Sequence, residues 1–219
     1  MQIKIMQNVL QANEKKAAEI RTLLQQKKIF MTNLISSPGS GKTTLLEKTL
    51  PLLKEKYRIA VIEGDVETDK DAKRLEKYGV PIALINTNGA CHLESVSIEK
   101  AFSALDMDNL DLIFVENVGN LVCPAEFDIG ENAKVAILST PEGDDKPMKY
   151  PLLFREATLV ILNKMDLLKH VDFSPTSFYA DIKKLKSNLP VIETDCKNNL
   201  GIDKWIEWLE KQIELLSKA

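Results

Sequence analysis

The sequence predicts an α/β fold in which one doubly wound, mostly parallel sheet forms a single domain over residues 1–219, with an accessory helix within residues 1–27. Short apolar runs alternate with helical patterns along the chain, as they do in sheets built from βαβ units. Several of these runs are apolar throughout, which is typical of strands that are covered on both faces. A length of 219 residues suffices for one well-buried domain of this kind and is short for two.

The expected elements follow in order from the N-terminus. Residues 8–26 are expected to form an amphipathic helix on the outside of the sheet, with an apolar face made of Val9, Leu10, Ala17, Ile20, Leu23 and Leu24. Strands are expected at 29–35, 58–63, 82–85, 112–116, 135–139, 159–162 and 191–193. Further helices are expected at 42–56, 69–78, 93–105, 175–187 and 203–217, and the loop 141–151 is expected to be irregular. Ligands of such sheets bind at the carboxyl ends of the strands, where the motifs described below also fall.

The composition excludes several classes of function. Lys and Arg total 29 against 32 Asp and Glu, a net charge of −3, so no nucleic-acid partner is expected. No apolar stretch approaches the ~18–20 residues that span a membrane, and the N-terminus lacks the apolar core of a signal peptide. We therefore expect a cytoplasmic protein without membrane contact, whose three cysteines are thiols or metal ligands rather than disulfides.

A phosphate-binding loop follows the first expected strand as Ser36-Ser37-Pro38-Gly39-Ser40-Gly41-Lys42-Thr43-Thr44. Its end matches the P-loop pattern G-x-x-x-x-G-K-[ST], although Ser36 stands at the first glycine position. Loop amides and the helix N-terminus would face the phosphates, Lys42 would bridge the β- and γ-phosphates, and the Thr43 hydroxyl would bind Mg²⁺. The nucleotide-binding residues expected in this loop are Gly39, Ser40, Gly41, Lys42, Thr43 and Thr44.

A base-reading element, Asn163-Lys164-Met165-Asp166, follows the strand expected at 159–162. The Asp166 carboxylate can accept hydrogen bonds from the N1 and N2 donors of guanine, which adenine lacks, so the expected nucleotides are GTP and GDP. Cys196 and Lys197 follow the last strand, where GTPases make a backbone contact to guanine, but a polar turn explains this pair equally well.

Two acids end strands close to the expected phosphate site. Glu116, in Glu116-Asn117-Val118-Gly119, stands where a carboxylate holds Mg²⁺ through water and a following glycine senses the γ-phosphate. Asp65 ends the second strand and is expected to contact magnesium or to position the attacking water. The expected catalytic residues are Lys42, Asp65 and Glu116, and the expected Mg²⁺ ligands are Thr43, Asp65 and Glu116. Since no Ras-like glutamine is identifiable, slow or partner-dependent hydrolysis is expected.

A second metal site is suggested by Cys91, His92 and Cys123, a soft sulfur and nitrogen ligand set suited to Ni²⁺ or Zn²⁺. Adjacent ligands such as Cys91 and His92 reach one ion only where the backbone bends, as at a helix start. Spacing by itself equally allows a buried apolar cysteine and a histidine that caps a helix or lies in the core.

At these residues the chain resembles the HypB family of nickel-incorporation GTPases of hydrogenase maturation. The most specific strings are Ala90-Cys91-His92-Leu93-Glu94 and Glu116-Asn117-Val118-Gly119-Asn120-Leu121-Val122-Cys123-Pro124. The others are the phosphate loop, Glu63-Gly64-Asp65, Glu142-Gly143-Asp144-Asp145-Lys146 with Lys149-Tyr150-Pro151, and Asn163-Lys164-Met165-Asp166. The resemblance covers essentially the whole chain.

This resemblance implies a metallochaperone of the dimerising class of P-loop GTPases, in which GTP drives a homodimer together face to face. It implies that Cys91, His92 and Cys123 hold Ni²⁺ or Zn²⁺ at the interface, and that Lys149 reaches the nucleotide of the other subunit, with Asp145 or Lys146 as alternatives. The implied partners are a maturation chaperone and the hydrogenase large subunit.

Some members of the family carry a Cys-x-x-Cys-Gly-Cys motif or a histidine-rich stretch. Here no cysteine precedes Cys91 and the second histidine, His170, is expected at the surface, so nickel storage is not expected.

Three other classes of protein fit the sequence less well. A urease-type nickel GTPase would carry a Cys-Pro-His motif, whereas here Cys123-Pro124 is followed by Ala125. A signalling GTPase would leave the cysteines structural. A small-molecule P-loop kinase would need a lid rich in arginine. The few arginines of this chain are not clustered; they are Arg21, Arg58, Arg74 and Arg155.

The spacing of one segment also suggests a coupling mechanism. Glu116, Gly119 and Cys123 follow the same strand, so sensing of the γ-phosphate at Gly119 could move Cys123. Metal affinity would then differ between the GTP and GDP states.

Overall fold

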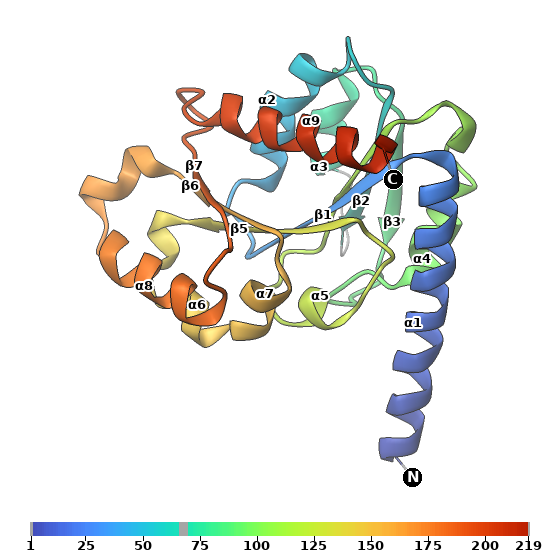
Figure 1. The fold of residues 1–219 in the computed structure, drawn as a ribbon, viewed down its shortest axis with the longest axis horizontal. Coiled ribbons are helices and arrows are strands. Elements are labelled where there is room, and N and C mark those ends of the chain that lie inside the picture. Colours follow the sequence, from blue (N-terminus) through green and yellow to red (C-terminus); the bar gives the residue numbers. More distant parts are fainter. Residues whose placement is uncertain (1, 66–69, 219) are drawn as a thin grey trace.

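The computed structural model describes residues 2–65 and 70–218, with side chains from residue 10 onward. Its centre is a seven-stranded sheet in the order β3-β2-β4-β1-β5-β6-β7, and every neighbouring pair is parallel. Helices cover both faces of this sheet (Figure 1). The predicted α/β fold with a doubly wound parallel sheet is therefore confirmed.

All seven expected strands are present, and β4 and β7 have the expected bounds. The strands are β1 (Phe30–Ser36), β2 (Ile59–Asp65), β3 (Ile82–Asn86), β4 (Leu112–Glu116), β5 (Ala133–Ser139), β6 (Leu159–Asn163) and β7 (Val191–Glu193). Every residue of β1, β4 and β6 is buried, as the continuous apolar runs predict.

The expected helices are also present, but the structure adds three short ones. The helices are α1 (Gln2–Lys27), α2 (Lys42–Leu53), α3 (Lys70–Glu76), α4 (Ser95–Phe102), α5 (Cys123–Glu126), α6 (Lys146–Lys149), α7 (Pro151–Glu156), α8 (Pro175–Leu185) and α9 (Ile202–Lys218). Short 3₁₀ turns lie at Met107–Asn109, Thr140–Glu142 and Met165–His170. Asp69, the first residue of the helix expected at 69–78, lies outside the described residues.

The prediction of an irregular loop over 141–151 is wrong. The segment contains α6 and the start of α7, and Pro147 and Pro151 each stand in the first turn of a helix. Proline is tolerated there because the backbone N–H that it lacks has no partner within the helix. Two prolines that suggest a loop therefore lie in the first turns of two short helices.

The two faces of the sheet are covered by different helices. Leu112 and Phe114 of β4 pack in a cluster with residues of α2, α3 and α9, while Ile113 and Val115 pack with residues of α1 and α4 on the opposite face. Farther along the sheet, α5, α7 and α8 cover that second face (Figure 1). Successive side chains point to opposite faces of a strand, which is why apolar residues occupy every position.

The helix α1 contributes directly to this core. Ala17, Ile20 and Leu24 are buried, and Ile20 and Leu24 belong to the cluster that covers β1 and β4. Leu10, which the periodicity places on the apolar face, is 36% exposed, so that part of the prediction is wrong. The side chain of Val9 lies outside the described residues. Among the described side chains of α1, the buried apolar ones that pack on the sheet lie in its C-terminal half.

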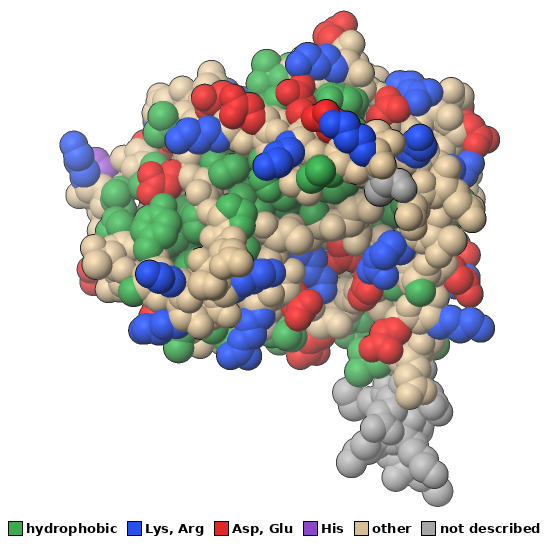
Figure 2. All heavy atoms as spheres, in the orientation of Figure 1, with side chains coloured by type: hydrophobic (Ala, Val, Ile, Leu, Met, Phe, Trp, Pro, Cys, Tyr) green, Lys and Arg blue, Asp and Glu red, His purple; other side chains and the backbone are tan. Residues whose placement is uncertain are grey.

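Within residues 2–65 and 70–218, no helix combines the length and apolarity that crossing a membrane requires. On the face drawn in Figure 2, Lys and Arg side chains lie among Asp and Glu side chains, with apolar side chains exposed between them.

Candidate functional site

The loop between β1 and α2 has the backbone that a phosphate-binding turn needs. Gly39 and Gly41 have φ angles of 77° and 104°, a region that side chains other than glycine rarely adopt. A Cβ atom on Gly41 would also lie 2.4 Å from Nδ2 of Asn163. Glycine at this position therefore allows both the turn and the close approach of the strand β6.

A pocket of about 530 Å³ opens beside this loop at the carboxyl ends of the central strands. Its lining comes from the phosphate loop, the ends of β2 and β4, the helix α3 and Lys164. It includes Gly39, Gly41, Lys42, Thr43 and Thr44 of the residues expected to bind phosphate, together with Asp65, Glu116 and Gly119. Parallel strands bring their carboxyl ends to one edge, which explains why these separate segments meet.

Lys42 and Thr43 are both buried and oriented by hydrogen bonds. Lys42 Nζ donates to Ser36 Oγ at 3.0 Å, so the residue that replaces the first glycine of the pattern holds the lysine. Thr43 Oγ1 donates to Glu116 Oε1 at 2.7 Å. The structure thus brings together Lys42, Thr43 and Glu116, which the sequence predicts as parts of one site.

Three carboxylates converge at the floor of the pocket. Oxygen atoms of Glu63, Asp71 and Glu116 lie within 4.8 Å of one another, and Glu63 faces Glu116 in the register of β2 and β4. Burial raises the pKa of Glu116, and burial followed by repulsion from Glu116 raises the pKa of Glu63 to about 10. One oxygen of each glutamate, Oε2, is buried without a hydrogen-bond partner.

This donor set fits a hard dication such as Mg²⁺, which binds carboxylate and hydroxyl oxygens and would relieve the repulsion between the glutamates. Asp65 lines the same pocket but is not one of the three converging carboxylates. No motif of the sequence predicts a role for Glu63 or Asp71. The signal for Glu63 was its place in a strand that ends beside the strand of Glu116, because paired parallel strands align such acids.

Asn163 and Lys164 connect the base-reading segment to the phosphate loop. Asn163 is buried, its Nδ2 donates to the Ser40 carbonyl at 2.9 Å, and its Oδ1 accepts from Thr194 Oγ1 at 3.0 Å. Lys164 Nζ donates to the Gly39 carbonyl at 2.7 Å. These contacts hold the end of β6 beside the loop, where a nucleotide could contact both.

Asp166, Cys196 and Lys197 lie beyond the lining of the phosphate pocket. Asp166 is exposed in the 3₁₀ turn Met165–His170, so its carboxylate is accessible to a base. Cys196 packs in the core, and burial raises the pKa of its thiol to about 11. The Lys197 backbone N–H donates to Asp195 Oδ1 at 2.9 Å, so this N–H is already engaged. The predicted guanine contact therefore does not fall to this N–H.

Lys149 lies in α6 and does not line the phosphate pocket of its own chain. Its side chain is 60% exposed and forms an ion pair with Asp145, which also pairs with Lys146 at 2.8 Å. Hydrogen bonds from Lys146 and then Lys149 lower the pKa of Asp145 to about 2. The neighbouring Glu142 accepts a hydrogen bond from Ser40 Oγ at 2.8 Å, so this segment contacts the phosphate loop.

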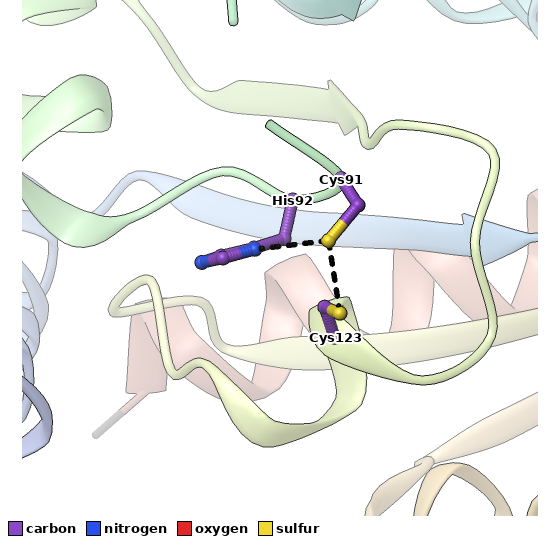
Figure 3. A group of neighbouring side chains, drawn as sticks. All are labelled: Cys91, His92 and Cys123. Carbon is purple, nitrogen blue, oxygen red and sulfur yellow. Dashed lines mark hydrogen bonds between the residues drawn. The ribbon is translucent and has the colours of Figure 1, made fainter. Parts of the chain in front are cut away.

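The structure brings the three predicted soft ligands together (Figure 3). The sulfur atoms of Cys91 and Cys123 are 2.9 Å apart, and Cys91 Sγ is 3.7 Å from His92 Nδ1. A hydrogen bond from Cys91, followed by burial, raises the pKa of Cys123. Both cysteines are free and reach the surface, so an ion from solution could bind them. Two sulfurs and one imidazole suit Ni²⁺ or Zn²⁺.

The backbone at Cys91 and His92 bends in a turn and not at a helix start. The helix α4 begins only at Ser95, and the two ligands lie in the turn before it, while Cys123 is the first residue of α5. The turn rather than a helix start supplies the bend that lets adjacent ligands face one site.

Two neighbours determine the orientation of His92. Its ring lies against Phe127, with 3.9 Å between ring centroids, and its Nε2 lies 3.6 Å from Glu94 Oε1. Nδ1 therefore faces the sulfur atoms while Nε2 faces a carboxylate, an arrangement common for metal-binding histidines. His170 is exposed, as predicted.

One segment connects the pocket to the soft ligands. A Cβ atom on Gly119 would lie 2.8 Å from Pro38 Cγ, so the segment after β4 packs tightly on the phosphate loop. Asn120 Nδ2 donates to the Cys91 carbonyl at 3.2 Å, and its Oδ1 accepts from the Val122 N–H at 3.0 Å. The same short segment thus contacts the phosphate loop at one end and both cysteine-bearing segments at the other.

This chain is similar to known proteins over most of its length. The family model described as "CobW/HypB/UreG, nucleotide-binding domain" matches residues 30–193. The hydrogenase maturation factor HypB of Azotobacter chroococcum mcd 1 is 47% identical over 210 residues, which cover 96% of this chain and 69% of that protein. The hydrogenase/urease maturation factor HypB of Helicobacter hepaticus is 44% identical over 214 residues, covering 96% and 88%. The crystal structure of HypB from Helicobacter pylori in complex with nickel has a TM-score of 0.88 and 37% identity, covering 93% of this chain and 95% of that one.

Proposed function

The chain belongs to the HypB family of hydrogenase maturation factors, and from this premise we propose that it is a magnesium-dependent GTPase that binds nickel and delivers it during hydrogenase maturation. The observation that carries this proposal is the direct connection, through Gly119 and Asn120, between the phosphate loop and Cys91. A nucleotide pocket and a soft metal site that share one segment suit a protein in which GTP controls a metal.

The phosphate pocket has the groups that GTP hydrolysis requires. Lys42 exchanges its contact with Ser36 for oxygens of the β- and γ-phosphates, and the loop amides bind the remaining oxygens. Thr43 and Glu116, with Asp65, would hold Mg²⁺, which neutralises charge developing on the phosphates. Glu63 and Asp71 add negative charge around that ion. Asp65 could instead position the attacking water. Without an identified glutamine for this task, the intrinsic rate is slow.

The cargo binds at Cys91, His92 and Cys123. Ni²⁺ and Zn²⁺ both suit this ligand set, and nickel is favoured because a relative of 37% identity is described in complex with nickel. Three ligands leave a position open, through which the ion could be passed to another site. The recipients in this proposal are a maturation chaperone and the hydrogenase large subunit, and the work takes place in the cytoplasm.

Dimerisation would place this chemistry under nucleotide control. Lys149 is exposed and outside its own phosphate pocket, which suits a lysine that contacts the nucleotide of a second subunit. Cys91 and Cys123 reach the surface, which suits a metal shared across a homodimer. A change in the contact between Gly119 and the γ-phosphate would then move Cys123, which follows in the same segment.

Replacing Cys123 with alanine is expected to weaken nickel binding about 100-fold or more, because one of two thiolate ligands is lost. The rate of GTP hydrolysis by the monomer should change little, because Cys123 does not line the phosphate pocket. Chelator competition and phosphate release measure the two effects. Cys196→Ala is the matched control, because Cys196 is buried in the core and should not affect nickel. Unchanged nickel affinity in the Cys123 variant would favour a signalling GTPase with structural cysteines.

Nickel affinity is expected to differ between the protein bound to GDP and the protein bound to a non-hydrolysable GTP analogue. Coupling of two sites typically changes affinity about 5- to 150-fold. Equilibrium sedimentation with each nucleotide, with and without Ni²⁺, gives the mass and the metal content of each species. The analogue should favour a dimer, and Lys149→Ala should weaken that dimer. Equal nickel affinity in both nucleotide states would contradict the proposed control by GTP.

A further inference from the structure

The side chain of Asn13 in α1 joins two segments that carry the soft ligands. Its Nδ2 donates to the Asp128 carbonyl at 2.7 Å, and its Oδ1 accepts from the Ser95 backbone N–H at 2.9 Å. The Ser95 hydroxyl also donates to the Asn13 carbonyl at 3.0 Å. Ser95 closely follows Cys91 and His92, and Asp128 directly follows Phe127 at the end of the segment that begins with Cys123.

We infer that Asn13 is a positioning residue for the metal site, an inference that rests on the function proposed above. One buried amide group ties the His92 segment to the Phe127 segment, and Asn13 does not line the phosphate pocket. The ring of His92 is thereby held against Phe127, and its Nδ1 is directed to the cysteine sulfurs. A ligand orientation set by such an outer contact is typical of protein metal sites.

The attachment of α1 does not require this asparagine. Arg21 Nη2 contacts both carboxylate oxygens of Asp128 at 2.8 Å, and Lys16 pairs with Glu99 at 2.9 Å. Ile20 and Leu24 are buried against the sheet. A buried amide adds stability only when it is paired, and an apolar residue could fill the same space. What an amide supplies here, and an apolar residue does not, is a donor for one segment and an acceptor for the other.

The test compares Asn13→Ala, Asn13→Asp and Ser95→Ala with the unaltered full chain. Asn13→Ala removes every side-chain contact to Asp128 and Ser95, and Asn13→Asp keeps an acceptor for Ser95 but loses the donor to Asp128. Ser95→Ala keeps its backbone N–H contact to Asn13. We expect nickel affinity to fall about 10- to 100-fold in both Asn13 variants, with an altered thiolate-to-nickel absorption band, and to stay near its starting value in Ser95→Ala. Affinity for GDP should be unchanged throughout.

A second readout does not depend on nickel. Phenylarsine oxide binds two thiols only when they lie close together, so its affinity reports the arrangement of Cys91 and Cys123. It should fall in the Asn13 variants and not in Ile20→Val, a core change in the same helix that leaves the amide in place. If Asn13→Ala does not fold, Asn13→Asp, which has the same size, provides the test.

The outcomes separate the two proposals. Nickel and arsenical affinities equal to those of the unaltered chain in both Asn13 variants would overturn the role of Asn13. Parallel losses of nickel and GDP affinity would also overturn it, because they would indicate a general disturbance of the fold. If the unaltered chain binds no nickel, the proposed function fails, whereas weaker arsenical binding in the Asn13 variants would still support the positioning of the ligand segments by Asn13.

Discussion

Replacing Lys42 with methionine is expected to lower the rate of GTP hydrolysis by about 10²–10³-fold or more. Lys42 is buried at the start of α2, and its ammonium group is already directed by Ser36 Oγ at 3.0 Å. A charged group that is oriented before the reaction stabilises charge on the phosphates as it develops, and removal of one such group typically costs this factor. Methionine keeps most of the side-chain length without the charge.

Phosphate release at saturating GTP, together with the affinity for a fluorescent GTP analogue, measures this effect. Ser36 Oγ also donates to the Ser37 carbonyl at 2.7 Å, so the loop keeps that contact in the variant. Lys48→Met is the matched control, since Lys48 lies in the same helix but does not line the phosphate pocket. Equal loss of activity in both variants, or hydrolysis in Lys42→Met at the original rate, would contradict the role given to Lys42.

Replacing Asp166 with asparagine is expected to shift the preference of the protein from guanine toward xanthine. The Asp166 carboxylate accepts from two donors of guanine, and hydrogen bonds to a charged group each contribute about 1.5–3 kcal/mol. Asparagine keeps one acceptor oxygen and loses the other, which would lower GTP affinity by about 10–10²-fold. The asparagine amide N–H would meet a donor on guanine but an acceptor on xanthine, so affinity for xanthosine triphosphate should rise. Adenine has neither the two donors of guanine nor the donor and acceptor of xanthine at these positions, so ATP affinity should stay low.

Competition of GTP, xanthosine triphosphate and ATP against a fluorescent GDP analogue measures these preferences. Asp166 is exposed in the 3₁₀ turn after β6, so the substitution should leave the fold intact. Asp172→Asn makes the same chemical change at an exposed position nearby and should leave the preference unchanged. A GTP preference that survives in Asp166→Asn would show that another residue reads the base.

Sequence reasoning predicted the strands well because each strand is apolar over its own length. The seven apolar runs, and the glycines and charges that follow them, are local features. It failed where a local signal was ambiguous. Pro147 and Pro151 suggest a loop, yet each lies in the first turn of a helix, and Leu10 follows the helical periodicity although its side chain is exposed.

The site shows the same division. The residue types of Lys42, Thr43 and Glu116 predict their chemistry, and the structure places all three in the lining of one pocket, with Thr43 hydrogen-bonded to Glu116. The sequence predicts no role for Glu63 or Asp71, because Asp65 is the residue singled out in the string Glu63-Gly64-Asp65 and Asp71 stands in none of the motifs. Their meaning comes from the register that sets Glu63 opposite Glu116 and from the helix that adds Asp71.

By itself the sequence determined the fold class, the phosphate loop, the base-reading element and the ligand types at Cys91, His92 and Cys123, because periodicity and side-chain chemistry belong to single segments. Only the tertiary structure decided which distant groups meet. It sets the two sulfurs 2.9 Å apart, pairs the buried glutamates and places Asn13 between Ser95 and Asp128. Such contacts join residues far apart in the chain, and their geometry follows from how strands pair and helices pack rather than from any local pattern.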